Sequence, residues 1–133
     1  MKVKFIIDTK PVPKARPRLG RGGRVFTPQT TLEFERICAL AYGNRHNFGK
    51  DPISIKITFN FEVPKSYTKK KCLEALNGIV RPGRNDIDNL VKSVLDGLNG
   101  IAWEDDRYLF YIEAEKRYNT KDFIEVEIWD REG

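Results

Sequence analysis

The chain has 133 residues, and its 24 basic and 19 acidic side chains give a formal net charge of +5. Hydrophobic residues make up 40% of it and charged residues 32%, which predicts one globular domain over residues 1–133. Because charges interrupt every apolar stretch and the apolar run at the N-terminus is short, we expect neither a membrane span nor a secretory signal. Because Cys38 and Cys72 lack paired-ligand spacing, a zinc site or disulfide scaffold is disfavoured, and we expect a reduced, cytoplasmic protein.

The chain begins with a predicted strand at residues 2–8, followed by a strongly basic loop at about residues 9–26. Residues 1–50 carry 11 basic and 3 acidic side chains, whereas residues 101–133 carry 5 and 10. Prolines favour an extended loop, and glycines loosen its tip. The basic side chains of the loop are Lys10, Lys14, Arg16, Arg18, Arg21 and Arg24. Such a cluster favours contact with nucleic acid phosphates, the alternatives being a solvated loop, an acidic protein or a nucleotide.

A helix and a strand are predicted next. Thr27 is the expected N-cap and Pro28 the expected first helical residue, and the helix ends near Gly43. Its predicted apolar face consists of Phe34, Ile37, Cys38 and Ala41. Residues 53–63 alternate strictly, with large apolar side chains on one face and polar ones on the other, which predicts a strand with one face in the core.

The second half of the chain contains two more predicted helices and two more predicted strands. Ser66 is the expected cap of a short lysine-rich helix that runs to about Asn77, and the next helix covers residues 88–99, with Gly100 in a left-handed position. The strands are predicted near residues 108–118 and 122–129. The order β-α-β-α-α-β-β indicates a mixed α+β domain with helices packed on one sheet.

Carboxylates gather in two places that flank the last predicted helix. Asp86 and Asp88, two residues apart, are expected on the same side, and Lys92 follows Asp88 by one helical turn, with Asp96 next in the row. The acidic turn Glu104-Asp105-Asp106 begins a predicted strand. This turn can be folded back beside Asp86 and Asp88. Three carboxylates at one point repel each other unless a cation is bound.

Oxygen donors without histidine or cysteine select Mg²⁺, with Mn²⁺ as a substitute. Such an ion beside a lysine suits metal-assisted hydrolysis of a phosphodiester. The alternatives are structural: Asp88 caps the helix, Lys92 pairs with Asp88 or Asp96, and the acidic turn is only solvated.

These motifs resemble the RusA family of crossover junction endodeoxyribonucleases, found largely in phages and bacterial prophages. The resemblance lies in Pro13-Lys14-Ala15-Arg16-Pro17-Arg18, Phe26-Thr27-Pro28, Asp86-x-Asp88-Asn89-Leu90-x-Lys92, Leu95-Asp96-x-Leu98-Asn99-Gly100 and Glu104-Asp105-Asp106. It implies a Mg²⁺-dependent homodimer that resolves Holliday junctions by paired symmetric nicks in DNA recombination and repair.

The resemblance also assigns roles to individual residues. Asp86, Asp88 and Asp106 are implied as metal ligands and catalytic carboxylates, with Asp105 as the alternative third ligand, and Lys92 is implied as the catalytic lysine. Some members of the family carry a basic residue directly before the first aspartate, where this chain has Asn85. Arg84, one position earlier, is expected to supply that charge. Two other functions remain open from the residues alone: a DNA-binding module without catalysis, and a nuclease for another branched DNA or for RNA.

Overall fold

The computed structural model describes residues 1–15, 18–23, 25–26 and 28–131, with residues 18, 19, 21, 25 and 26 described as backbone only. The elements in chain order are β1 (Lys2–Ile7), β2 (Arg18–Leu19), the 3₁₀ turn η1 (Arg21–Gly23), β3 (Val25–Phe26), α1 (Gln29–Tyr42), β4 (Ile53–Glu62), α2 (Lys69–Leu76), α3 (Ile87–Leu98), the 3₁₀ turn η2 (Asp106–Tyr108), β5 (Leu109–Asn119) and β6 (Phe123–Trp129). The predicted α+β class and element order are confirmed, with a small hairpin added inside the basic loop.

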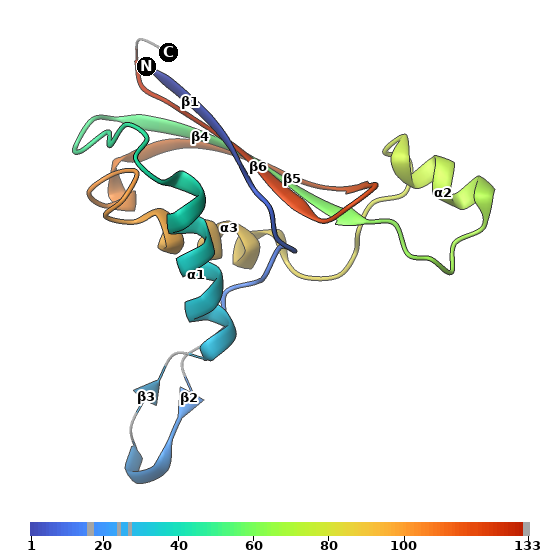
Figure 1. Cartoon of the computed structure of the whole chain (residues 1–133), viewed down its shortest axis with the longest axis horizontal. Helices are drawn as coiled ribbons and strands as arrows, with labels where there is room; N and C mark the ends of the chain where they lie inside the picture. Colours follow the sequence, from blue (N-terminus) through green and yellow to red (C-terminus); the bar gives the residue numbers. More distant parts are fainter. Residues whose placement is uncertain (16–17, 24, 27, 132–133) are drawn as a thin grey trace.

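One four-stranded sheet, in the order β1-β6-β4-β5, forms the body of the molecule (Figure 1). β5 runs parallel to β4, and the other neighbouring strands are antiparallel. β5 and β6 follow each other in the chain but do not pair, because β4 lies between them. β5 is an edge strand that follows the acidic turn and η2 in the chain.

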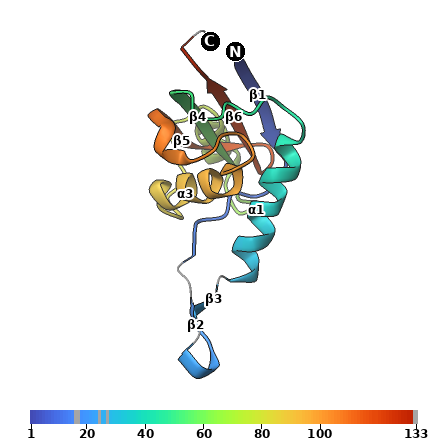
Figure 2. The same cartoon turned by 90° about the vertical axis from the view of Figure 1, so that its left-hand side faces the viewer.

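The core lies between the sheet and the two long helices α1 and α3 (Figures 1 and 2). The alternation in β4 is confirmed, since Ile53, Ile55, Ile57 and Phe59 are all buried. On the opposite face of β4, Asn60 is also buried, and its amide donates to Glu125 Oε1 at 3.0 Å. None of the described helices is long and apolar enough to span a membrane.

The helices α1 and α2 both begin later in the chain than the sequence predicts. α1 begins at Gln29, and Pro28 occupies the N-cap position with an extended backbone, while Thr27 lies outside the described residues. Its buried face is rotated from the predicted one: Thr31 and Tyr42 are buried, whereas Ile37 is 38% exposed. The helix end is confirmed, since Gly43 follows it with a positive φ of 59°.

The short lysine-rich helix α2 is capped by Thr68 and not by Ser66. The Thr68 hydroxyl accepts a hydrogen bond from the backbone N–H of Lys71 at 3.2 Å. The helix therefore starts later than expected, and α2 stands apart from α1 and α3, beyond the far end of the sheet (Figure 1).

The basic loop forms a hairpin that extends away from the body of the molecule (Figures 1 and 2). β2 pairs with β3, and η1 joins them with Gly22 and Gly23 at positive φ values of 74° and 76°. The glycines thus provide the left-handed backbone that this tight turn requires. A projecting hairpin with basic residues is suited to reach a bulky polyanion.

Candidate active site

The first turn of α3 presents the first two candidate carboxylates. Asp86 is the N-cap residue but its side chain makes no capping hydrogen bond, and Asp88 lies inside the first turn. The interpretation of Asp88 as the helix cap is therefore wrong. Both side chains are exposed, and the positive end of the helix dipole favours their negative charge.

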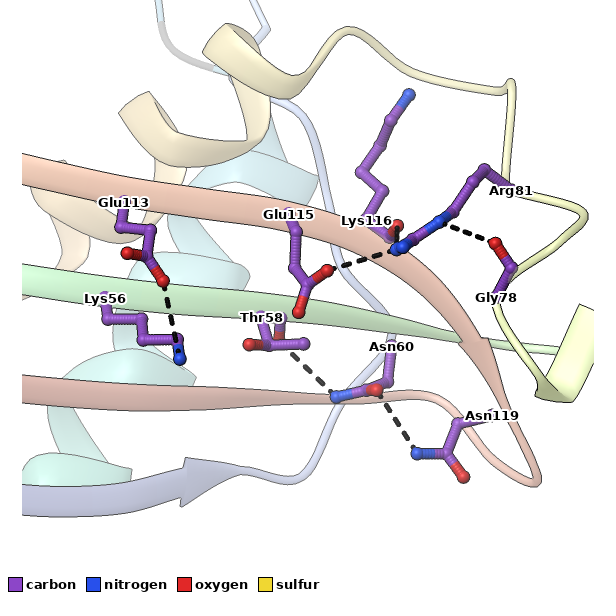
Figure 3. A network of polar contacts seen from close by, with 9 residues as sticks. All are labelled: Lys56, Thr58, Asn60, Gly78, Arg81, Glu113, Glu115, Lys116 and Asn119. Carbon is purple, nitrogen blue, oxygen red and sulfur yellow. Dashed lines mark hydrogen bonds and ion pairs between the residues drawn. The ribbon is translucent and has the colours of Figure 1, made fainter.

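The turn that carries Asp86 is tied to the edge strand β5. Asn85 has a left-handed backbone with φ 70°, which asparagine tolerates better than most residues. Lys116 Nζ donates to the Asn85 carbonyl at 2.7 Å. Arg81 donates to Glu115 Oε2 and to the Lys116 carbonyl, both at 3.1 Å, and to the Gly78 carbonyl (Figure 3). These bonds fix the segment before α3 in place.

The candidate catalytic lysine lies in a row of charges along α3. Lys92 Nζ is 3.2 Å from Asp96 Oδ1, one helical turn further on, and the Lys92 side chain is 55% exposed. The charge of Lys92 also acts on Asp106, in η2. Lys92 and Asp96 on α3 therefore interact electrostatically with Asp106, and more than half of the Lys92 side chain is accessible to solvent.

The two aspartates of the acidic turn have different surroundings. Asp105 Oδ1 accepts the backbone N–H of Arg107 at 3.0 Å, and this bond lowers the pKa of Asp105. Partial burial raises the pKa of Asp106, and a hydrogen bond with Asp105 raises it further, while the Lys92 charge opposes both. Asp105 is engaged as the cap of η2, and the charges of Lys92 and Asp96 on α3 act on Asp106; which of the two aspartates binds a metal ion stays a prediction.

Within the described residues, no three acidic, histidine or cysteine side chains lie close enough together to hold a metal ion. Asp86 and Asp88 lie at the start of α3, whereas the α3 side chains whose charges act on Asp106 are Lys92 and Asp96, further along that helix. The donor chemistry nevertheless suits Mg²⁺, because all candidate donors are carboxylate oxygens. Their assignment as metal ligands stays a prediction.

Lys14, which the sequence predicts to contact DNA, forms two ion pairs within the protein. Its Nζ lies 3.0 Å from Asp96 Oδ2 and 3.3 Å from Glu35 Oε1, and its backbone N–H donates to the Asn89 carbonyl at 2.9 Å. Burial lowers the pKa of Lys14, but its bonds to Asp96 and Glu35 outweigh that effect and raise it. Lys14 therefore anchors the base of the basic loop to α1 and α3.

Lys14→Met is expected to lower the free energy of unfolding by about 1–2 kcal/mol, because Asp96 and Glu35 lose a partly buried partner. Lys10→Met is the matched control: it removes an exposed lysine of the same loop and should leave stability unchanged. Thermal and denaturant unfolding measure both. Equal stability of the two variants would contradict the anchoring role of Lys14.

The structure describes only some of the other residues that are predicted to contact DNA. Lys10 and Arg84 are exposed. Arg18 belongs to β2 and Arg21 to η1 by their backbone, and Arg16 and Arg24 lie outside the described residues. Their contact with DNA stays a prediction.

Sequence reasoning missed two residues that organise the site, Glu35 and Lys116, and one of the two ion pairs of Asp96. The spacing of Asp96 from Lys92 signals their ion pair, but nothing local signals that the second oxygen of Asp96 binds Lys14. Glu35 and Lys116 reach partners 21 and 31 residues away in the chain, so only the fold reveals their contacts.

Two comparisons with known proteins cover nearly the whole chain. The family model described as endodeoxyribonuclease RusA matches residues 8–129, which include every candidate site residue. The uncharacterized protein YqaN of Bacillus subtilis (strain 168) is 31% identical over 134 aligned residues, covering 95% of this chain and 94% of that protein.

Proposed function

The chain belongs to the endodeoxyribonuclease RusA family, and on that premise we propose that it is a Mg²⁺-dependent endonuclease that resolves four-way DNA junctions in recombination and repair. Family membership makes it a member of a nuclease family that acts on DNA. Three points are proposed beyond family membership: the four-way junction as the substrate, Mg²⁺ as the metal, and paired nicks as the result.

The observation that carries the proposal is the position of Lys92. Its exposed amine lies 3.2 Å from Asp96 and acts on Asp106, and it follows Asp88 by one helical turn. An accessible cation among carboxylates can bind an oxygen of the scissile phosphate and stabilise the charge that develops there. Asp96 acts on the substrate only through Lys92, because it holds the amine in position.

Asp86, Asp88 and Asp106 are the residues proposed to hold the metal ion, with Asp105 as the alternative to Asp106. Bound Mg²⁺ would supply neutralising charge for the phosphodiester and a water of lowered pKa. Water attacks the phosphorus in line, and the bond between phosphorus and the 3′ oxygen breaks. The 3′ oxygen leaves with its sugar as a 3′-hydroxyl, and the other product carries a 5′-phosphate.

DNA binding is assigned to the basic loop, at about residues 9–26, and to Arg84. Lys14 fixes the base of the hairpin, and the basic residues beyond it are proposed to contact phosphates. A homodimer is part of the proposal, because a four-way junction has two-fold symmetry and a two-fold dimer presents two identical sites to equivalent strands.

The testing experiment measures cleavage of a synthetic four-way junction, a linear duplex and a branched RNA, each with Mg²⁺, Mn²⁺ and EDTA. We expect paired symmetric nicks in the junction only, with either metal, and none in EDTA. Junction binding without nicks under both metals would contradict catalysis and favour a DNA-binding module. Faster cleavage of the RNA would overturn the choice of substrate.

A further inference from the structure

A cavity of about 390 Å³ opens where the ends of β4 and β5 meet the loop that leads into α3. The residues of its lining that bear on its chemistry are the cations Lys10 and Arg84, the acids Glu62 and Asp122, and Phe61, Asn85 and Tyr118. Asn85 directly precedes Asp86, so the cavity borders the first candidate carboxylate.

Two cations from distant parts of the sequence converge on this cavity. Lys10 follows β1 and Arg84 lies in the loop before α3, and both side chains are exposed. Within the described part of the chain, neither takes part in an ion pair. The nearby Asp122 carboxylate is already engaged, since its Oδ1 accepts the backbone N–H of Glu62 at 2.8 Å. Lys10 and Arg84 are therefore available to an anion.

The inner side of the cavity is aromatic. Phe61 is only 8% exposed, and Tyr118 is half-buried beside it in the register of β4 and β5. The Tyr118 hydroxyl lies 3.2 Å from that of Tyr67, and the two rings meet edge to face with centroids 5.9 Å apart. The ring of Tyr118 is thus held in a defined position, as a stacking surface needs to be.

The walls of the cavity are preformed. Lys116 Nζ donates to the Asn85 carbonyl at 2.7 Å. Arg81 ties the same loop to β5 (Figure 3). Asn119 Nδ2 donates to Asn60 Oδ1 at 3.2 Å and joins the ends of the two strands that carry the aromatic residues (Figure 3). A site that is ordered before binding costs less conformational entropy when it is filled.

We propose that this cavity binds an unpaired nucleotide of the DNA substrate next to the scissile phosphate, its base on Tyr118 and its phosphate on Lys10 and Arg84. A lone phosphate makes no use of the aromatic side, and a continuous duplex keeps its bases stacked, whereas stacking is interrupted at a branch point, so that a base there can leave its pair at lower cost. The Asn85 side-chain amide adds an acceptor for amino groups on a base edge. The inference rests on the proposed function, because it requires a branched DNA substrate.

The test uses four-way junctions with 2-aminopurine at each position around the branch point, bound in EDTA so that no cutting occurs. Wild type is expected to raise the fluorescence at one position severalfold, because that base leaves the stack. Tyr118→Leu should abolish this rise and weaken binding about fivefold or more, while Tyr118→Phe, which keeps the ring, should retain the rise.

The two cations are tested by the salt dependence of junction binding. Lys10→Ala and Arg84→Ala should each reduce the slope of log affinity against log salt by about 1, as expected for one lost phosphate contact. Lys4→Ala is the matched control, since Lys4 is an exposed lysine of β1 that pairs with Glu127; it should leave the slope unchanged. Because these are exposed positions, this measurement stands even where Tyr118→Leu fails to fold.

The outcomes separate this inference from the proposed function. Cleavage of the junction by wild type, with no fluorescence rise at any position or with a rise that Tyr118→Leu retains, would overturn the nucleotide site alone. Unchanged slopes for both Lys10→Ala and Arg84→Ala would overturn the phosphate contacts. Equal binding of junction and duplex by wild type, without cleavage, would overturn the proposed function and the nucleotide site with it.

Discussion

Asp88→Asn is expected to slow junction cleavage by at least about a hundredfold and to leave junction binding at least as tight as in wild type. Loss of a charged metal ligand removes several kcal/mol of transition-state stabilisation, and each 1.36 kcal/mol is a factor of ten in rate. Binding is retained because it depends on cations elsewhere, and one fewer carboxylate reduces repulsion of the phosphates. Single-turnover cleavage in Mg²⁺ and gel-shift binding in EDTA measure the two effects.

Asp51→Asn is the matched control, because Asp51 is an exposed aspartate in the turn before β4. It should cut and bind as wild type does. Asp88→Asn should also unfold close to the wild-type temperature, since an exposed aspartate in a first helical turn contributes about 0.3–1 kcal/mol. An Asp88→Asn variant that cuts at the wild-type rate would show that Asp88 is not a metal ligand.

The pattern of side chains along the chain was enough to predict most elements of this fold. Alternation in residues 53–63 depends only on which face of a strand is buried, and β4 follows it. The start of α1 was misplaced because proline is compatible with both the N-cap and the first helical position, and its own backbone decides between them. Local patterns thus locate elements well and their ends less well.

The candidate site was predictable in its residue types but not in its contacts. The carboxylates flanking α3 and the spacing of Lys92 are visible in the sequence, whereas the electrostatic interaction of Asp106 with Lys92 depends on how the fold places the turn before β5 relative to α3. The same holds for Lys14, whose neighbours in sequence are basic and whose partners in space are acidic. Contacts between distant segments are set by packing, which no short motif encodes.

Gly97→Ala is expected to destabilise the protein by about 1–3 kcal/mol, a large effect for one methyl group. Gly97 is buried in α3, where a Cβ would lie 2.7 Å from Cys38 Cβ and 3.3 Å from the Cα of Glu35. Neither atom is the end of a flexible side chain, so α1 and α3 must move apart. Alanine is worth about 1 kcal/mol more than glycine in a helix, which offsets only part of this cost.

Gly83→Ala is the control for this prediction, because a Cβ at Gly83 meets no heavy atom within 4 Å. It should unfold at the wild-type temperature, while Gly97→Ala unfolds several degrees lower. An unchanged unfolding temperature for Gly97→Ala would show that the helices separate without cost.

The close approach of α1 and α3 at Gly97 also matters for the site. Glu35 on α1 and Asp96 on α3 flank this contact, and both bind the amine of Lys14. Separation of the helices therefore loosens the anchor of the basic hairpin and the carboxylate that holds Lys92. We expect Gly97→Ala to lower junction cleavage severalfold at temperatures where it is still folded, and Lys14→Met to add little to that loss, because both changes break the same contact.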